Sequence, residues 1–354
     1  MEYLDAASFL RKSEFYPILD VRSPGEFLIG HIPGAINLPL FTNEERKEIG
    51  ILYKNSGKEA SVLKGLDIVG PKMSAYVKKV RSLVVGKQVL VHCWRGGMRS
   101  ASMAWLLETA GFEAHVLEGG YKAFRKFIRS EFERNYNLVV LGGKTGSGKS
   151  EILNSIRKIG EQVIDLEKMA NHKGSAFGAF GQGQQPTSEH FENMLYEEFK
   201  RLDKSRYIWV EDESRSIGTV SLPEPFFNNI RSSPLIFIDV PKEVRIERLV
   251  KDYAGFDKNR LKDATLRIQQ KLGGLNTKLT IEAIEQDDFR TASSILLSYY
   301  DKAYIKGLSY RNSEQIHTVS LGKSDPSENA KTVVAFFQSS VAKSLISAKL
   351  PTHE

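Results

Sequence analysis

The sequence predicts an α/β protein made of two consecutive parallel-sheet domains, the second of which carries a mostly helical C-terminal extension. Apolar strand-like segments alternate with helical segments along the 354 residues, and this pattern is typical of parallel sheets. The pattern stops once and then restarts, which predicts two sheets. Each half also contains a glycine-rich loop placed directly after an apolar strand and before a helix.

The domain boundaries follow from the place where the pattern restarts. A chain of 354 residues has room for two or three domains. We expect a first domain at residues 1–120, a connector helix at 121–135 and a second domain at 136–354. Within the second domain, residues 258–306 are mostly helical and form the predicted extension.

The first domain contains four predicted strands and three predicted helical regions. It opens with a short helix, and a charged helical region covers residues 42–82 with a break near 65–71, where glycine and proline occur. A helix at 101–110 is followed by Gly111, which suits a helix C-terminus. The predicted strands are 16–22, 35–38, 89–92 and 114–117.

The connector helix has two different faces. Its apolar face contains Tyr121, Phe124, Ile128 and Phe132. Four cations with helical spacing share another face, which is either solvated or in contact with a polyanion: Lys122, Arg125, Lys126 and Arg129. In the second domain we expect a helix at 151–159 and strands at 138–141, 162–166, 207–211, 235–240 and 316–320.

Composition excludes several classes of protein. Hydrophobic residues make up 41% and charged residues 26%, which is typical of globular proteins. No apolar run approaches about 20 residues, so we expect no transmembrane helix, and the N-terminus lacks the layout of a signal peptide. A cytoplasmic enzyme is the simplest interpretation. The net charge of +7 permits an anionic partner, and a single cysteine excludes an intramolecular disulfide.

The second glycine-rich loop matches the P-loop pattern G-x4-G-K-[ST]. Backbone N–H groups of such a loop surround phosphate oxygens, and the helix N-terminus adds partial positive charge. Lys149 would reach the terminal phosphate, and Ser150 would bind Mg²⁺ or the phosphate itself. The motif predicts a phosphate ligand without specifying ATP. Its residues are Gly143, Lys144, Thr145, Gly146, Ser147, Gly148, Lys149 and Ser150.

Acidic residues end two strands of the second domain. Glu211, Asp212 and Glu213 follow one strand and Asp165 follows another. The carboxyl edge of an open α/β sheet is where ligands bind, so these side chains are candidates for holding Mg²⁺ or acting as a general base. Three consecutive acids repel one another unless cations balance them, which favours a functional role for this group.

The only cysteine, Cys93, follows a strand and precedes a helix. Its loop contains Gly96, Gly97, Arg95 and Arg99, and such a loop directs backbone N–H groups toward an anion. The arginines and the helix N-terminus favour the thiolate form of the cysteine. Two chemistries suit this arrangement: sulfur or selenium transfer through a Cys93 persulfide or perselenide, and phosphate ester hydrolysis through a cysteinyl phosphate.

The first domain resembles the rhodanese family. The resemblance rests on Asp20-Val21-Arg22-Ser23-Pro24-Gly25-Glu26-Phe27, on Gly30-His31-Ile32-Pro33-Gly34-Ala35-Ile36-Asn37 and on the Cys93 loop. It implies structural rather than catalytic roles for Asp20 and Arg22. Five residues separate Cys93 from Arg99, one more than in thiosulfate sulfurtransferases and as in phosphatases of the Cdc25 type. The longer loop suggests a larger oxyanion, such as a phosphate-bearing donor.

The whole chain resembles the tRNA 2-selenouridine synthases. The cysteine loop with a downstream P-loop carries the resemblance, which extends from about Leu19 to Tyr304. The chain departs from the family pattern at Lys168-Met169, where the family has Gly-Leu, and at Lys173, where the family has arginine. Lysine keeps the charge but cannot make a bidentate phosphate contact. The supporting motifs in the second half are Asp165-Leu166-Glu167, Ala170–Gly178, Glu211–Gly218 and Tyr299-Tyr300-Asp301.

The resemblance implies a two-step reaction on the wobble uridine in the anticodon loop of tRNA. Geranyl diphosphate alkylates a 2-thiouridine, and selenium from selenophosphate then replaces the S-geranyl group. The P-loop would hold the diphosphate, with Mg²⁺ near Ser150 and no requirement for ATP. The Cys93 loop would hold selenophosphate, its thiolate would accept selenium, and Arg95 and Arg99 would neutralise the phosphate. No obligate protein partner is implied.

The expected contacts to tRNA are cationic and aromatic. They include Lys173, His172, Arg215 and the cationic face of the connector helix, while Asp165 and Glu211–Glu213 complete the predicted substrate site. Splayed bases stack on aromatic side chains in many RNA-binding proteins; Trp94, Phe177 and Phe180 either stack on a base, line the geranyl pocket or belong to the core. The glycine- and glutamine-rich stretch 174–185 has little apolar content, so we expect a mobile loop outside the core and near the site.

Three other interpretations remain open. The first is a P-loop kinase or NTPase fused to a Cdc25-like cysteine phosphatase, for which Arg245 and Arg248 resemble the arginines of a kinase lid. The second is an ATP-dependent tRNA thiolase, but those enzymes use a Ser-Gly-Gly-x-Asp-Ser loop, which this sequence lacks. The third is a non-enzymatic tRNA-binding protein, and the intact Cys93 argues against it.

Overall fold

The structure is a computed structural model that describes residues 1–322 and 325–343. Residues 323–324 and 344–354, which fall within the predicted second domain, lie outside the described residues. The chain forms two compact units. The first contains Met1–Glu133 and Glu192–Glu197, and the second contains Arg134–Phe191 and the described residues from Glu198 onward.

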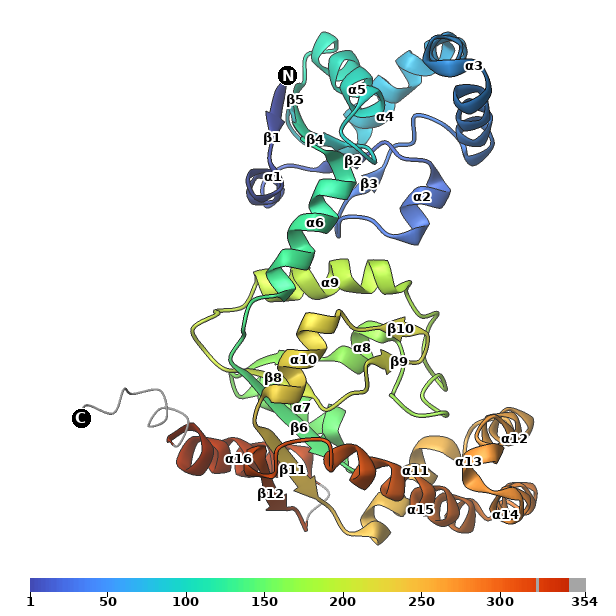
Figure 1. Cartoon of the computed structure of the whole chain (residues 1–354), viewed down its shortest axis with the longest axis vertical. Helices are drawn as coiled ribbons and strands as arrows, with labels where there is room; N and C mark the ends of the chain where they lie inside the picture. Colours follow the sequence, from blue (N-terminus) through green and yellow to red (C-terminus); the bar gives the residue numbers. More distant parts are fainter. Residues whose placement is uncertain (323–324, 344–354) are drawn as a thin grey trace. The chain divides into compact units, whose positions relative to one another are not determined.

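The first unit contains a five-stranded sheet in which every strand is parallel to its neighbours, as the α/β prediction requires. The strand order is β1-β5-β4-β2-β3. Helices α1 and α6 lie side by side, as do α4 and α5 (Figure 1). The strands are β1 (Glu2–Leu4), β2 (Ile18–Asp20), β3 (Ile36–Asn37), β4 (Gln88–His92) and β5 (Glu113–Leu117). The helices are α1 (Ala6–Lys12), α2 (Pro24–Ile29), α3 (Asn43–Val69), α4 (Met73–Leu83), α5 (Met98–Thr109) and α6 (Gly120–Phe132).

The N-terminal strand β1 is absent from the sequence prediction, which placed only a short helix at the start of the chain. Three residues are too few to show the alternation that identifies a strand. Strand β1 pairs with β5 from the far end of the unit. The predicted helix follows it as α1, and the Asp5 carboxylate caps this helix by accepting a hydrogen bond from the Ser8 N–H at 2.7 Å.

The long charged region breaks where the sequence predicted. Helix α3 begins with a capping box between Thr42 and Glu45, a 3₁₀ turn follows at Gly70–Lys72, and α4 continues the chain. A second interruption at Gly57 was not predicted. Its φ of 81° is left-handed, so α3 consists of two helical segments that meet at this glycine.

A buried ion pair lies under the cysteine loop. Arg22 Nη2 donates to Asp20 Oδ2 at 2.6 Å, and both side chains are fully buried. The Arg22 guanidinium also lies 3.8 Å from the centre of the Tyr121 ring. Burial lowers the pKa of the adjacent His92 to about 4, so this imidazole is neutral at pH 7. These residues hold strand ends together and do not face solvent, in keeping with the structural roles expected for Asp20 and Arg22.

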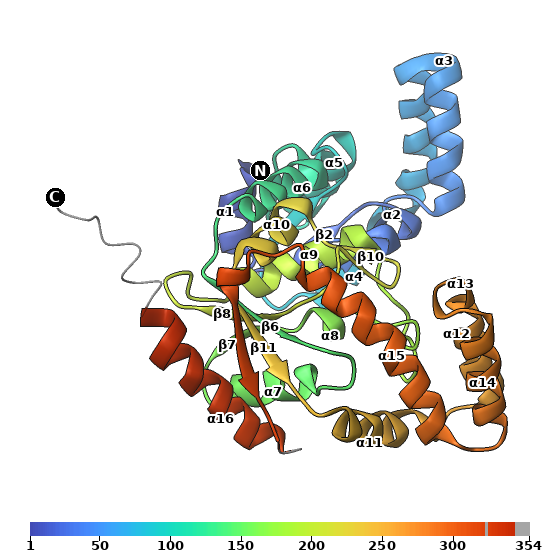
Figure 2. The same ribbon diagram turned by 60° about the horizontal axis from the view of Figure 1, so that its bottom comes forward.

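The second unit contains another five-stranded parallel sheet and a separate two-stranded hairpin, β9–β10. The large sheet has the order β12-β11-β6-β8-β7. Helices α12, α13 and α14 gather at one end of α15 (Figure 2), so the predicted helical extension is confirmed. The strands are β6 (Leu138–Gly143), β7 (Gln162–Ile164), β8 (Ile208–Glu211), β9 (Ser216–Ile217), β10 (Val220–Ser221), β11 (Leu235–Asp239) and β12 (Ile316–Ser320). The helices are α7 (Lys149–Lys158), α8 (Leu166–Ala170), α10 (Glu224–Ser232), α11 (Lys242–Tyr253), α12 (Lys258–Arg267), α13 (Gln269–Leu272), α14 (Gly274–Glu285), α15 (Phe289–Leu308) and α16 (Pro326–Phe336).

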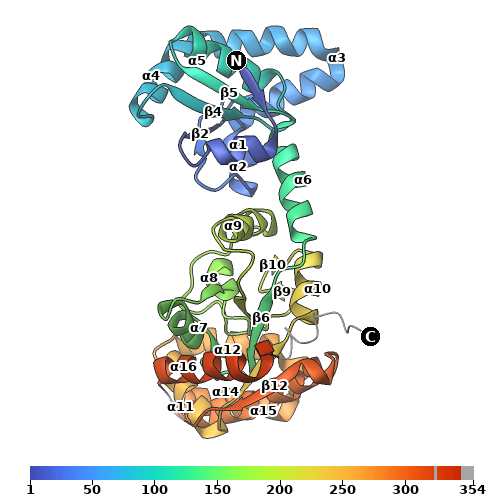
Figure 3. The ribbon, with the colours of Figure 1, turned by 90° about the vertical axis from the view of Figure 1, so that its left-hand side faces the viewer.

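Helices α7 and α16 lie side by side against this sheet (Figure 3). Their apolar faces pack on Trp209 and Leu141, which are buried in a hydrophobic cluster of this unit. Helix α9 (Ser188–Lys200) contributes residues Glu192–Glu197 to the first unit. No helix within the described residues is both long and apolar enough to cross a membrane.

Candidate functional site

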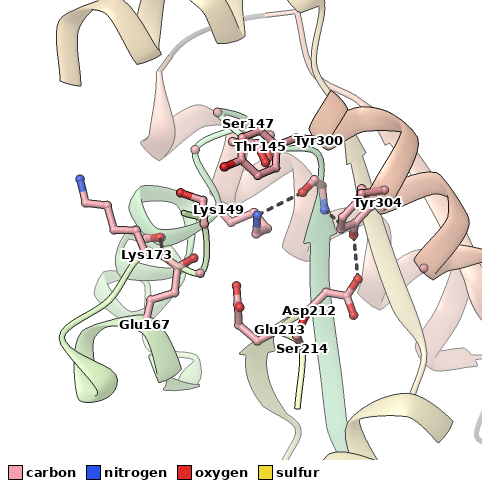
Figure 4. Close-up of a pocket in the computed structure, with 18 of the residues that line it drawn as sticks. Thr145, Ser147, Lys149, Glu167, Lys173, Asp212, Glu213, Ser214, Tyr300 and Tyr304 are labelled. Atoms are coloured by element: carbon pink, nitrogen blue, oxygen red, sulfur yellow. Dashed lines mark hydrogen bonds between the residues drawn. The ribbon is translucent and has the colours of Figure 1, made fainter. Parts of the chain in front are cut away.

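The P-loop forms the floor of a cleft of about 750 Å³ in the second unit (Figure 4). The loop leaves strand β6, and helix α7 begins at Lys149. Gly146 and Gly148 have φ angles of 79° and 81°, which favour glycine and let the backbone curl. Lys149 Nζ donates to the Gly143 carbonyl at 3.1 Å, so its ammonium group lies over the loop. The loop therefore has the shape that phosphate binding needs.

Two further residues of the motif show which side of the loop faces a ligand. The Ser147 hydroxyl is buried and has no hydrogen-bond partner among the described residues, and an orphaned donor of this kind suits a phosphate oxygen. Lys144 does not line the cleft. Its ammonium lies 3.6 Å from Asp239 Oδ1 and over the Phe237 ring. Lys144 is thus a structural member of the motif.

Three polar side chains meet beside the P-loop. Ser150 Oγ donates to Glu167 Oε2 at 2.7 Å, and the Glu213 carboxyl lies close to Glu167. Burial and then the Glu167 charge raise the pKa of Glu213 well above its ordinary value, so this acid retains its proton to higher pH. Mg²⁺ usually binds one or two carboxylates together with substrate phosphates. Ser150 and Glu167 therefore fit an ion that arrives with a phosphate.

Asp212 orients the P-loop through a hydrogen-bond chain. The Tyr304 hydroxyl donates to Asp212 Oδ2 at 2.8 Å and accepts from the Gly143 N–H at 2.9 Å. Arg311 Nη2 donates to Asp212 Oδ1 at 2.7 Å, and Arg231 lies 3.7 Å from the same oxygen. The cations that the sequence argument required are present here, because the two arginines balance the Asp212 charge.

Asp165, His172 and Glu211 do not line the cleft. The Glu211 side chain is fully buried and accepts from the Leu166 N–H at 2.8 Å, and burial raises its pKa well above the ordinary value. Asp165 caps α8 by accepting from the Lys168 N–H. His172 is buried against Gly178, and burial lowers its pKa. Strand alternation explains why Glu211 points away from the cleft while the next residue, Asp212, lines it, because neighbours on an extended chain point to opposite faces.

The predicted cations of the second unit reach the cleft. Lys173 and Arg215 are solvent-exposed and line it, together with Arg231 and Arg248. Arg215 pairs with Glu224 at 3.1 Å, and Arg248 pairs with Glu151. Arg245 is buried instead: its guanidinium forms two hydrogen bonds with Asp301 at 2.8 and 2.7 Å and donates to the Thr145 carbonyl. It supports the P-loop from behind.

Cys93 lies at the base of its loop in the first unit. It directly follows β4, and α5 begins at Met98. The thiol is 2% exposed, and its Sγ lies 3.2 Å from Ser100 Oγ. The turn that leads into α6 fixes the loop backbone, since the Tyr121 N–H donates to the Cys93 carbonyl at 2.8 Å.

The two arginines of this loop differ in their surroundings. Arg95 is exposed to solvent, whereas Arg99 is partly buried. Arg99 Nη1 donates to Glu26 Oε2 at 2.8 Å, and Nη2 lies 3.4 Å from Oε1. Burial raises the pKa of Glu26, but the hydrogen bond and charge of Arg99 outweigh it, so the pKa lies below the ordinary value. Glu26 thus holds Arg99 in place at the end of the loop.

Comparison with known proteins agrees with both halves of this picture. A model described as the tRNA 2-selenouridine synthase AAA domain matches residues 136–266, and the rhodanese-like domain matches residues 5–127. The tRNA 2-selenouridine synthase of Bdellovibrio bacteriovorus is 36% identical over 348 residues, which cover 84% of this chain and 90% of that protein. The chain belongs to the tRNA 2-selenouridine synthase family.

Other members of the synthase family match at similar levels. The protein of a Sulfurovum species is 35% identical over 81% of this chain and 87% of its own length. That of Nitrosomonas eutropha is 38% identical over 67% of this chain, and the match spans 63% of that relative. The rhodanese and P-loop assignments made from the sequence are therefore confirmed at the level of family.

Sequence reasoning missed several residues of the cleft in this member of the synthase family. Glu167 lies two residues after the chosen Asp165, and only the fold shows that Glu167 faces the P-loop. Tyr300 belongs to a family motif, but its position on the wall of the cleft comes from α15. Tyr304, Arg231 and the exposed Tyr310 also line the cleft. They come from α10 and from the end of α15, which no local motif links to the P-loop.

The prediction that residues 174–185 lie outside the core was wrong. Phe177 and Phe180 are buried in an aromatic cluster with Tyr253 and Phe256. Gln185 Nε2 also donates to two backbone carbonyls, at Ala170 and at Ile217. Two aromatic side chains thus anchor a stretch whose average composition is polar. The stretch does begin at the cleft, as expected, because Gly174 and Ser175 line it.

The cationic face of the connector helix is only partly free. The predicted apolar face is buried. Arg125 is buried as well, and its guanidinium donates to Asn193 Oδ1 at 2.5 Å and pairs with Glu192. Lys122, Lys126 and Arg129 are exposed. Arg125 is therefore a structural contact to residues of α9 in the same unit, and the expectation that all four cations face solvent or a polyanion was wrong for this residue.

The cysteine loop depends on one glycine that no other residue can replace. Gly120 has a φ of 61°, and a Cβ built on it would lie 2.3 Å from the Gly96 nitrogen and 2.4 Å from the Cys93 carbonyl oxygen. We expect Gly120→Ala to lower the free energy of unfolding by at least about 3 kcal/mol, because backbone of the loop must move. Denaturant unfolding measures this loss.

Gly111→Ala is the matched control. Gly111 has a φ of 90° but open space around it, so its substitution adds only left-handed strain of about 1–2 kcal/mol. Equal losses for the two variants would contradict the proposed packing of the loop against Gly120.

Proposed function

We propose that this protein converts 2-thiouridine at the wobble position of tRNA into 2-selenouridine in two steps. The names of its relatives support tRNA modification. In the first step the P-loop cleft binds geranyl diphosphate and the thiocarbonyl sulfur is alkylated. In the second step the Cys93 loop supplies selenium from selenophosphate, and selenium replaces the S-geranyl group.

In the first step the P-loop stabilises the leaving group. The bond between C1 of the geranyl group and the diphosphate oxygen breaks, a bond between C1 and the uridine sulfur forms, and the proton on N3 of the base is released. Negative charge grows on the diphosphate during this step. Lys149, Ser147 with its unpaired hydroxyl, and the loop backbone line the cleft, so we expect them to stabilise that charge.

The observation that carries this proposal is an apolar pocket next to the P-loop. It has a volume of about 50 Å³ and shares part of its wall with the cleft: Thr145, Ser175, Leu249, Tyr253 and Tyr300. Its remaining wall consists of Phe177, Leu261, Ile284, Phe289, Ala292, Ser293 and Leu296. A water molecule needs roughly 10–15 Å³ of such a cavity. The pocket therefore has room for about one of the two branched five-carbon units of a geranyl group.

The pocket suits a hydrocarbon chain better than the base of a nucleotide. None of the described residues that line it has a charged side chain. Burial raises the pKa of Tyr253 to about 12 and that of Tyr300 further, so both hydroxyls stay neutral. A ligand with phosphates at the P-loop and an apolar chain in this pocket satisfies both surfaces, whereas a nucleobase would leave polar groups unpaired there.

The tRNA would reach the cleft along its cationic rim. Arg215, Arg231 and Lys173 line this rim, and the Tyr310 ring is 73% exposed beside them. Cations bind the phosphate backbone, and exposed rings stack on splayed bases. Phe177 and Phe180 are buried, so we propose that Tyr310, and not these two residues, stacks on a base of the tRNA.

Reconstitution tests the proposal. The protein is incubated with 2-thiouridine tRNA, geranyl diphosphate, selenophosphate and Mg²⁺, and the nucleosides are analysed by mass spectrometry. We expect 2-selenouridine, and S-geranyl-2-thiouridine when selenophosphate is omitted. Unchanged nucleosides from a folded protein would contradict the proposal.

Filling the apolar pocket is expected to weaken binding of geranyl diphosphate. Ala292→Leu places three additional carbons where the chain would lie, and the affinity should fall roughly tenfold or more because buried methylene contacts are lost. Inorganic diphosphate should bind within about twofold of wild type, since the P-loop is unchanged. Calorimetric titration without tRNA measures both affinities.

Ala283→Leu provides the matched control. Ala283 belongs to the same apolar cluster but does not line the pocket, so the same substitution there should leave both affinities unchanged. Equal weakening of diphosphate and geranyl diphosphate by Ala292→Leu would show that the chain lies elsewhere.

A second candidate function is a P-loop kinase or NTPase fused to a Cdc25-like phosphatase. Arg248 lines the cleft, as a lid arginine of a kinase would. Arg245, the other candidate lid residue, is buried and bonded to Asp301, which leaves it unable to approach a ligand. ATP hydrolysis in the absence of tRNA, together with unchanged nucleosides in the reconstitution, would favour this alternative.

A further inference from the structure

We infer that Cys93 attacks the phosphorus atom of selenophosphate, so that a cysteinyl phosphate forms and selenium leaves as selenide. This inference rests on the proposed function, which brings selenophosphate to the Cys93 loop. The Cys93 thiolate could bond either to the selenium atom or to the phosphorus atom of selenophosphate. The two routes differ in oxidation state, and the structure of the loop favours one of them.

The loop has the parts of a phosphoryl acceptor. Five residues separate Cys93 from Arg99, and Ser100 follows directly. The Ser100 hydroxyl lies 3.2 Å from Cys93 Sγ and 3.0 Å from the Gly97 carbonyl oxygen. Its single proton can therefore turn from the carbonyl to the sulfur when negative charge develops there.

This hydroxyl is placed to stabilise a thiolate when it leaves. When the bond between sulfur and phosphorus is hydrolysed, Cys93 is expelled as a thiolate, and a hydrogen bond from Ser100 stabilises it. Arg99, fixed by Glu26, is the cation that pairs with a tetrahedral oxyanion at the end of the loop.

The phosphorus route balances without a further reagent. The Cys93 thiolate attacks phosphorus, the phosphorus–selenium bond breaks, and hydrogen selenide leaves with both electrons of that bond. Selenide then attacks C2 of the S-geranyl base, and the geranyl thiol leaves with a proton. Water hydrolyses the cysteinyl phosphate to inorganic phosphate and restores the thiol. Phosphorus and selenium keep their oxidation states throughout.

The selenium route requires a reductant. Attack of the thiolate on selenium would form a sulfur–selenium bond and release phosphorus as phosphite, in a lower oxidation state. Delivery of that selenium to C2 would leave it attached to Cys93, and a second thiol would be needed to release it. Cys93 is the only cysteine of the chain, so the protein supplies no such thiol.

A labelling experiment separates the two routes. The full-length protein is mixed with selenophosphate that carries radiolabelled phosphorus, then denatured at mildly alkaline pH, digested and analysed by mass spectrometry. The phosphoryl and selenium adducts of Cys93 have nearly equal masses, but only selenium shows a broad isotope pattern. We expect the radiolabel on the Cys93 peptide, no selenium pattern, and inorganic phosphate as the product.

Two variants sharpen this test. Ser100→Ala should slow hydrolysis of the adduct roughly tenfold or more, so that labelled Cys93 accumulates, because a hydrogen bond to the departing thiolate is lost. Ser102→Ala is the matched control: Ser102 lies on the same helix but is exposed to solvent, and its variant should hydrolyse the adduct like wild type. Cys93→Ser should show no labelled adduct.

The outcomes separate this inference from the proposed function. Selenium on Cys93 with release of phosphite would overturn the inference while leaving selenium transfer intact. So would 2-selenouridine formation by Cys93→Ser at the wild-type rate. A wild-type protein that makes no 2-selenouridine and releases neither phosphate nor phosphite would instead contradict the proposed function.

Discussion

A Cys93→Ala variant is expected to form S-geranyl-2-thiouridine at the wild-type rate and to lose selenium incorporation by at least about a thousandfold, as removal of a nucleophile usually does. The thiol and the P-loop belong to different compact units. None of the described residues that line the P-loop cleft comes from the cysteine loop, so we expect the first step to proceed without Cys93.

Mass spectrometry of the nucleosides over time measures both steps in one reaction. Cys93 is buried, so we expect its truncation to lower the free energy of unfolding by about 1 kcal/mol. An unfolding curve of the variant provides the control. Loss of geranylation by a well-folded Cys93→Ala protein would contradict the division of labour, as would undiminished formation of 2-selenouridine.

A Lys149→Ala variant is expected to lose geranylation by about a hundredfold or more, because its ammonium group lies over the loop that we propose holds the diphosphate. Lys144→Ala serves as the matched control. It removes a lysine of the same motif that faces Asp239 and does not line the cleft, so geranylation should fall less than about threefold.

Initial rates of S-geranyl nucleoside formation distinguish the two variants. Binding of inorganic diphosphate should weaken in parallel for Lys149→Ala only. If both lysine variants reacted alike, the orientation of the P-loop described above would be wrong.

Local motifs explain why the two sites could be predicted from the sequence. The P-loop and the Cys93 loop each occupy a few consecutive residues between a strand and a helix, so the spacing of residues fixes most of their geometry. The chemistry of Lys149 and Ser150 follows from that spacing. The contact between Ser100 and Cys93 was not predicted; it arises because α5 begins at Met98 and brings the hydroxyl back to the sulfur.

The rest of the cleft could not be predicted because it depends on tertiary packing. Tyr304 reaches the Gly143 N–H across 161 residues of sequence, and no periodicity reveals such a contact. The choice between Glu211 and Glu213 depended on where β8 ends, because Glu211 is the last residue of the strand and Glu213 lies in the loop after it. Consecutive acids looked equivalent in the sequence, yet one is buried under α8 and the other lines the cleft.

Average composition was misleading for the glycine-rich stretch that begins at the cleft. Two phenylalanines in a polar segment are enough to anchor it when an aromatic cluster is available, and that cluster is formed by Tyr253 and Phe256 from a distant part of the chain. The apolar pocket next to the P-loop arises from the same packing. It is the feature on which the proposal of a ligand with both phosphates and a hydrocarbon chain rests.

The central claim is that the two steps are carried out by separate sites. The most direct measurement supplies purified S-geranyl-2-thiouridine tRNA and selenophosphate to the Lys149→Ala variant, and follows formation of 2-selenouridine by mass spectrometry. We expect this variant to form 2-selenouridine at a rate close to that of wild type, because the geranyl group is already in place and Cys93 is intact. No 2-selenouridine from this variant, with wild type active on the same tRNA, would contradict it.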